Sequence, residues 1–263
     1  MTTGANDISS CCAQVYGHPA ARFLLGDSFH PGGLELTAEL ASRLGISPRD
    51  TVLDAGSGPG ASAVHLARTT GCSVVRVTLE DRGAAEASAR ACREGVEHRV
   101  TVVQGDVETM DLGPGRFDVA IAECVVSMLP RKQKTLRNLH GLLRAGGRLG
   151  ITDVTVSGLL PPDLQGGLAS AGCVGDALPL DGYAALVSEA GFELEAAEDL
   201  PEVASAFLHS IGGRLLVAEI AARLGKIPIS AEAVHEAKRI LAETRSLVER
   251  GVIGYCMVTA RRP

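Results

Sequence analysis

The stretch Val52-Leu-Asp-Ala-Gly-Ser-Gly-Pro-Gly60 decides the fold, because a short apolar run breaks there into three alternating glycines. Residues 51–53 predict a buried strand, and residues 61–69 predict a helix directly after the turn. Glycine is needed where the backbone takes a positive φ or approaches a ligand closely. A strand, a glycine turn and a helix also aim free helix N–H groups at the region above the strand's carboxyl end. The stretch therefore predicts a ligand site at one edge of a parallel sheet.

Strands alternate with helices from residue 51 onward, which predicts a parallel sheet covered by helices on both faces. The glycines of Arg144-Ala-Gly-Gly147 predict the end of a helix just before the fifth strand. The last strand is expected to pair antiparallel with the sixth. The expected strands are residues 51–53, 73–79, 100–104, 117–122, 148–152, 192–198 and 254–260, and the expected helices are residues 34–44, 61–69, 84–94, 133–143, 183–189, 204–224 and 231–250.

These elements predict an α/β fold with a doubly wound, mostly parallel seven-stranded sheet. A helical excursion between the last two strands is expected to lie over the carboxyl edge of the sheet as a lid. The expected units are a helical N-terminal segment (1–45), an α/β core (46–200), a helical lid insertion (201–250) and the last core strand (251–263).

The composition limits the classes of function. The chain has 263 residues, 46% of them hydrophobic, which is enough for one sizeable α/β core. A net charge of −6 argues against a nucleic-acid partner, which favours a basic patch. No uninterrupted apolar run reaches the roughly 18 residues of a membrane span, and no signal-peptide core is present. We therefore expect a cytoplasmic protein without a membrane partner, and the sequence does not indicate its oligomeric state.

The cysteines are expected to be reduced in that compartment. The chain has seven of them, and no pair has the spacing of a zinc ribbon. They are available for other chemistry, or they pack as small apolar side chains, which is a common role of free cysteine. We assign the packing role to Cys72, Cys92 and Cys256.

An acidic residue, Asp54, precedes the first glycine of the turn and gives the spacing Asp-x-Gly-x-Gly-x-Gly. Dinucleotide-binding enzymes use Gly-x-Gly-x-x-Gly instead, and the Lys-Ser/Thr pair of a phosphate-binding loop is absent. The pattern resembles motif I of the class I S-adenosylmethionine (SAM) methyltransferases, and the resemblance covers most of residues 30–155. It implies SAM as the cofactor, with Asp54, Gly56, Gly58 and Gly60 beside its methionine part and ribose.

The same resemblance implies further cofactor contacts. In this family an acid at the end of the second strand binds the ribose, and here Thr78 stands in that place with Glu80 two residues later. Asp106 and Val107 lie in a turn that resembles the adenine-binding turn. Glu123 and the loop His30-Pro-Gly32-Gly33 would close the methionine end. Asp106 and Glu123 are also compatible with helix caps or solvated turn acids, and His30 with a structural role.

Cysteines that are candidates for the methyl-acceptor site lie in three separate parts of the chain. Cys124 follows the fourth strand, Cys173 lies in the loop after the fifth, and Cys11-Cys12 lies in the N-terminal segment. This arrangement resembles the arsenite methyltransferases. It implies that Cys124, Cys173 and one of Cys11 and Cys12 are catalytic thiolates that hold trivalent arsenic as the metalloid substrate. Thiolates are soft ligands that suit trivalent arsenic, and the arsenic lone pair attacks the methyl group without the help of a base. Glu123 in place of the usual Asn, and Val174-Gly175-Asp176 in the second loop, depart from that pattern.

Two other functions stay open. One is methylation of a small organic molecule, such as the O-, N- or C-methylation of a natural product, in a pocket under the lid. A hydroxyl or carbon acid would then need a base, for which the candidates are Asp27, His30, Tyr183 and His209. The other is a non-catalytic protein that binds SAM or a metalloid. The glycine spacing disfavours an NAD-dependent oxidoreductase.

Overall fold

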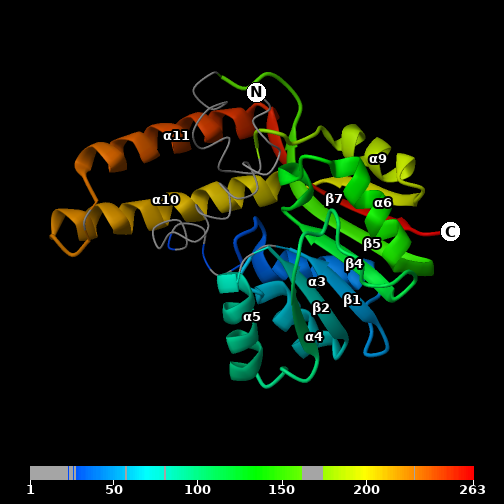
Figure 1. Ribbon diagram of the computed structural model, residues 1–263. Helices are drawn as coiled ribbons and strands as arrows, with labels where there is room; N and C mark the ends of the chain where they lie inside the picture. Colours follow the sequence, from blue (N-terminus) through cyan, green and yellow to red (C-terminus); the bar gives the residue numbers. More distant parts are fainter. Residues whose placement is uncertain are drawn as a thin grey trace, which may run out of the picture.

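The structure is a computed structural model that describes residues 23, 26, 28–56, 58–79, 81–161, 174–227 and 229–263. Its centre is a seven-stranded sheet with the order β3-β2-β1-β4-β5-β7-β6 (Figure 1). The strand pairs from β3 to β5 are parallel, and β7 runs antiparallel to both β5 and β6. The strands are β1 (Thr51–Ala55), β2 (Ser73–Thr78), β3 (Val100–Gln104), β4 (Phe117–Glu123), β5 (Leu143–Val156), β6 (Glu193–Asp199) and β7 (Ile253–Arg261). The predicted fold class is confirmed.

Helices cover both faces of this sheet (Figure 1). Alternate residues of a strand point to opposite faces, so Val52 packs with the residues of α3 and α4, whereas Leu53 packs with those of α6 and α9. Two apolar cores result, one on each side. The helices are α3 (Gly33–Arg43), α4 (Ala61–Thr70), α5 (Asp81–Arg93), α6 (Lys132–Leu142), α9 (Leu180–Glu189), α10 (Pro201–Arg223) and α11 (Ala231–Glu249), with the short 3-10 helix η1 (Val126–Met128) after β4.

The start of β5 differs from the sequence prediction. Helix α6 ends at Leu142, and residues 144–147 lie within β5 instead of closing the helix, so that prediction is wrong. The reason is a contact with the far end of the chain. The N–H of Gly146 donates to the carbonyl of Arg262, and the N–H of Arg262 donates to the carbonyl of Gly147. These bonds hold the glycines as an irregular part of the strand, where the register with β4 shifts.

Helices α10 and α11 occupy the expected excursion between β6 and β7. They pack against each other as an antiparallel pair that extends away from the sheet (Figure 1). Ser230 caps α11 by accepting a hydrogen bond from the N–H of Ala233. Helix α10 is long and apolar enough to cross a membrane by length and composition, and only 17% of the qualifying window is buried. A single helix of this kind is weak evidence for a membrane span.

Candidate cofactor and acceptor site

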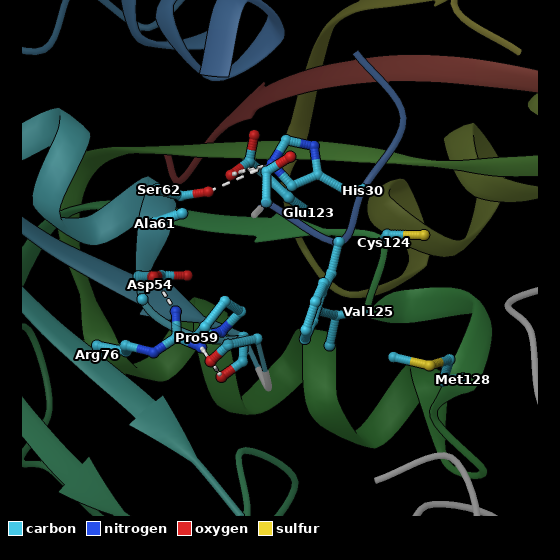
Figure 2. Close-up of a pocket in the computed structure, with 15 residues that line it drawn as sticks. His30, Asp54, Pro59, Ala61, Ser62, Arg76, Glu123, Cys124, Val125 and Met128 are labelled. Atoms are coloured by element: carbon cyan, nitrogen blue, oxygen red, sulfur yellow. Dashed lines mark hydrogen bonds and ion pairs between the residues drawn. The ribbon is translucent and has the colours of Figure 1, made fainter. Parts of the chain in front are cut away.

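A pocket opens where the carboxyl ends of β1 and β4 meet the start of α4 (Figure 2). In an open α/β sheet this is the expected place for a ligand. Seven of the residues predicted for the site from the sequence line the pocket, namely His30, Asp54, Gly56, Gly58, Gly60, Glu123 and Cys124. The other lining residues are Ser28, Phe29, Pro59, Ala61, Ser62, Arg76, Val125 and Met128.

The glycine turn after β1 forms one wall of the pocket. Gly60 is the residue before α4 and has φ +79°, a left-handed conformation that side chains rarely adopt. A Cβ atom at Gly60 would lie 2.5 Å from the Cβ of Ala87 in α5. The turn can therefore keep its course only with glycine at this position.

Arg76 lines the pocket beside the turn, and the sequence analysis missed it. It stands on β2 in register with Asp54 of β1, and both side chains are almost fully buried. Its Nη1 donates to Oδ2 of Asp54 at 2.6 Å. Its Nη2 donates to the carbonyls of Gly56 and Gly58 (Figure 2). An arginine inside a valine-rich strand was the signal that could have revealed it.

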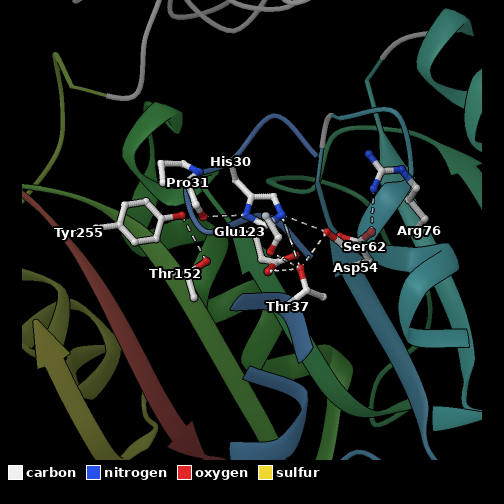
Figure 3. A network of polar contacts seen from close by, with 10 residues as sticks. His30, Pro31, Thr37, Asp54, Ser62, Arg76, Glu123, Thr152 and Tyr255 are labelled. Atoms are coloured by element: carbon white, nitrogen blue, oxygen red, sulfur yellow. Dashed lines mark hydrogen bonds and ion pairs between the residues drawn. The ribbon is translucent and has the colours of Figure 1, made fainter. Parts of the chain in front are cut away.

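A buried polar network forms the opposite wall (Figure 3). Nε2 of His30 lies 3.7 Å from Oε2 of Glu123, and the Thr37 hydroxyl donates to Oε1 of the same carboxylate at 2.9 Å. The Ser62 hydroxyl lies 3.4 Å from Nε2 of His30. On the other side of the ring, Nδ1 of His30 lies 3.1 Å from the carbonyl oxygen of Pro31. The network joins the segment before α3 to the end of β4 and the start of α4.

Cys124 stands at the turn between β4 and η1. It has φ +54° and is 8% exposed, and its N–H donates to the carbonyl of Thr152 at 2.7 Å. The next turn is anchored by Asp153 of β5, whose Oδ2 accepts a hydrogen bond from the N–H of Ser127 at 2.9 Å. Complete burial raises the pKa of Asp153 to about 6, and the hydrogen bonds from Ser127 and the nearby Lys132 oppose that rise.

The other predicted cofactor residues do not line this pocket. Thr78 is buried at the end of β2, and its Oγ1 has no hydrogen-bond partner in the part of the chain that the structure describes. Asp106 accepts a hydrogen bond from the N–H of Glu108 at 2.8 Å, and Val107 packs in the core beneath α6. Gly32 and Gly33 start α3, and Gly32 has φ +78°. Glu80, Cys11, Cys12, Cys173 and Asp27 lie outside the described residues.

The remaining cysteines and the proposed bases take various positions. Cys72 and Cys256 are buried as expected, and burial raises the pKa of both thiols. The assignment of Cys92 to the core is wrong, because this residue is exposed on the outer side of α5. Tyr183 is buried and donates its hydroxyl hydrogen bond to the carbonyl of Val154, while His209 is exposed on α10. Among the described residues, no group of three or more His, Cys, Asp or Glu could hold a metal ion.

The residues of the pocket fit SAM. The turn presents glycine backbone in the wall of the pocket, and Phe29 and Arg76 are the side chains nearest to Gly58. Oε2 of Glu123 is a buried carboxylate oxygen that makes no hydrogen bond within the described part of the chain, and its charge suits the ammonium group of the methionine part. Val125 and Met128 add an apolar surface beside Cys124.

Comparison with known proteins agrees with this site. Residues 53–151 match the methyltransferase domain family. Methyltransferase GfsG of Streptomyces halstedii is 31% identical over 180 residues, which are 67% of this chain and 64% of GfsG. The 27-O-demethylrifamycin SV methyltransferase of Amycolatopsis mediterranei is 29% identical over 235 residues, 87% of this chain and 83% of that protein. An arsenite methyltransferase of Halobacterium salinarum is 32% identical over 154 residues, 56% of this chain but only 38% of that enzyme.

Solved structures show the same fold. Phosphoethanolamine N-methyltransferase 2 of Haemonchus contortus, in complex with SAM, superposes with a TM-score of 0.78 at 20% identity. The match covers 99% of this chain and 58% of that chain. Together with the glycine turn and the strand order, the family match shows that residues 53–151 belong to a SAM-dependent methyltransferase domain with the class I fold, and that SAM is its cofactor.

Proposed function

We propose that the chain transfers the methyl group of SAM to a hydroxyl oxygen of a small organic molecule. The similarity to the 27-O-demethylrifamycin SV methyltransferase supports this proposal, because it extends over 87% of this chain. An alignment that covers this much of the chain includes regions outside the cofactor-binding core. The similarity to the arsenite methyltransferase covers a smaller share of both proteins.

The observation that carries the proposal is the orientation of His30. The carbonyl of Pro31 can only accept a hydrogen bond, so Nδ1 of His30 carries the proton that points to it. In the neutral imidazole Nε2 then presents its lone pair toward Ser62 and Glu123. Oε2 of Glu123 lies 3.7 Å from Nε2, on the same side of the ring. His30 is therefore arranged as a general base in the wall of the pocket.

The chemistry follows from these positions. When bound, SAM supplies an electrophilic methyl group on a sulfonium. The glycine turn and Glu123 would hold the cofactor, and Cys124, Val125 and Met128 would exclude water from the reacting atoms. The acceptor oxygen attacks in line with the bond that breaks, so the main task of the protein is to position it. His30 would take the hydroxyl proton at Nε2, a role that contributes typically about 10²–10⁴-fold to a rate.

Arsenite is the second candidate acceptor. Cys124 lines the pocket, and a thiolate there could hold trivalent arsenic together with Cys173 and one of Cys11 and Cys12. The arsenic lone pair would attack the methyl without a base, so His30 would have no part in the chemistry.

One experiment separates the two acceptors. The purified chain is incubated with methyl-labelled SAM and either a panel of small organic molecules with free hydroxyl groups or arsenite with a thiol, and S-adenosylhomocysteine is measured. A hydroxyl acceptor predicts turnover that falls about 100-fold or more in His30→Gln and falls much less in Cys124→Ser. Arsenite predicts the reverse pattern. SAM binding without turnover on any acceptor would instead support a non-catalytic SAM-binding protein.

A further inference from the structure

Arg76 is a buried arginine whose two Nη groups are directed at Asp54 and the turn after it, while its buried Nε makes no hydrogen bond with the described residues. Its side chain is 3% exposed, and Nη1 is 2.6 Å from Oδ2 of Asp54, whose side chain is 4% exposed. Nη2 donates to the carbonyl of Gly56 at 3.1 Å and to the carbonyl of Gly58. One guanidinium thus joins the last polar residue of β1 to two of the three alternating glycines.

Burial of this ion pair is costly unless its hydrogen bonds are made. Removing a charge from water costs several kcal/mol in a real protein, and close pairing with further hydrogen bonds is needed to offset that cost. The rigid fork of a guanidinium can serve a carboxylate and two carbonyls at once, whereas an ammonium group offers a single point charge. The contacts with Gly56 and Gly58 therefore offset part of the free-energy cost of burying Arg76 at this position.

The same contacts restrain a segment that is otherwise hard to order. Glycine loses more backbone freedom on folding than any other residue, and this turn has three glycines within five positions. The hydrogen bonds from Arg76 to the carbonyls of Gly56 and Gly58 limit the conformations of the turn before a ligand arrives. Binding to a preorganised segment avoids the ordering cost that otherwise weakens affinity.

We propose that Arg76 is a positioning residue for SAM: it holds the turn of residues 56–60 in its binding conformation through Asp54, Gly56 and Gly58. Arg76 itself acts through the turn and is not assigned to the chemistry. The inference rests on SAM as the occupant of the pocket and is independent of the methyl acceptor. Loss of the guanidinium is expected to appear in the dissociation constant for SAM, and not in the Michaelis constant for the acceptor.

The chain contains a matched control at the opposite edge of the same sheet. Arg148 of β5 pairs with Asp50 and donates from Nη1 to the carbonyls of Leu44 and Gly45. It makes the same set of contacts as Arg76, one carboxylate and two carbonyls, but at the amino ends of the strands. A purely structural role for such a group would affect stability at both sites and SAM affinity at neither.

The test measures SAM and S-adenosylhomocysteine binding by calorimetry, and the thermal midpoint, for the wild type, Arg76→Lys and Arg148→Lys. We expect both variants to lose thermal stability, while the dissociation constant for SAM rises at least 10-fold in Arg76→Lys and stays within 2-fold in Arg148→Lys. An unchanged constant in Arg76→Lys, or an equal rise in both variants, would overturn the proposal.

A second variant covers the case in which Arg76→Lys does not fold. The double variant Asp54→Asn/Arg76→Gln removes both charges of the pair and keeps polar groups at the two positions, and it is expected to bind SAM at least 10-fold more weakly than the wild type. Wild-type affinity in this variant would overturn the proposal. Because binding is measured without an acceptor, a wild type that binds SAM but methylates nothing would refute the proposed function and leave this test intact.

Discussion

The carboxylate of Asp153 on β5 accepts a hydrogen bond at 2.9 Å from the N–H of Ser127, three residues after Cys124. Its other oxygen accepts a hydrogen bond from the N–H of Val154. The buried acid thus ties the fifth strand to the segment that forms one side of the pocket. Ser127 donates through its backbone, so the anchor depends on Asp153 and does not need the serine side chain.

This anchor predicts a specific dependence of stability on pH. Burial raises the pKa of Asp153 from 3.8 to about 6 in the folded state. Between these values the folded state retains a proton that the unfolded state has lost, so the contribution of Asp153 to stability is complete below about pH 4 and falls as the pH rises to 6. The fall is on the order of 3 kcal/mol, because one pKa unit corresponds to about 1.4 kcal/mol.

The measurement is denaturant unfolding of the wild type and Asp153→Asn from pH 4 to pH 7.5. The asparagine does not titrate. The free energy of unfolding of the wild type should therefore fall relative to that of Asp153→Asn as the pH rises across this range. Parallel curves would mean that the folded-state pKa of Asp153 is not raised.

Gly60→Ala is expected to damage both the fold and the cofactor site. The substitution places a Cβ 2.5 Å from that of Ala87, and it forces an alanine to φ +79°. Gly95→Ala is the matched control, because Gly95 has φ +70° with no atom within 4 Å of the added Cβ. Left-handed strain alone costs about 1–2 kcal/mol, so we expect a loss of that size in Gly95→Ala with SAM binding retained. Gly60→Ala should be less stable still and bind SAM at least 10-fold more weakly, whereas equal SAM affinity in the two variants would contradict the assignment of the turn.

Glu123→Gln tests the methionine end of the site. Glutamine keeps an oxygen that can accept the hydrogen bond of Thr37, so the change removes the charge more than the packing. We expect the SAM dissociation constant to rise about 10-fold, which corresponds to about 1.4 kcal/mol. Glu198→Gln serves as the control, since Glu198 forms an exposed ion pair with Arg43 away from the pocket. Equal affinity in the two variants would place the ammonium of SAM elsewhere.

Much of the fold could be predicted because local patterns determine it. The apolar run at residues 117–122 predicts a buried strand, and the alternating glycines after Asp54 locate the ligand edge of the sheet. The irregular start of β5 could not be predicted, because the backbone of Arg262 supplies its hydrogen bonds from more than a hundred positions away. Local sequence favours a helix end there, and the tertiary contact overrides it.

The functional site, like the fold, could be predicted only in part from the sequence. Glu123 and His30 could be placed at one end of the pocket from their strand and loop, but their 3.7 Å approach depends on the position of α3 between them. Arg76 was missed because its role requires the register of β2 against β1, which brings it beside Asp54, 22 positions earlier in the chain. Patterns in a single sequence locate the edge of the sheet on which a ligand binds. Ion pairs between neighbouring strands can be identified only from the folded structure.

The central claim is that SAM binds against the glycine turn at the carboxyl ends of β1 and β4. A crystal structure of the chain with S-adenosylhomocysteine tests it most directly. The account predicts that the ligand lies along residues 56–60 with its amino-acid end toward Glu123. A ligand bound at any other place, or a pocket that stays closed by side chains while calorimetry detects no binding, would contradict it.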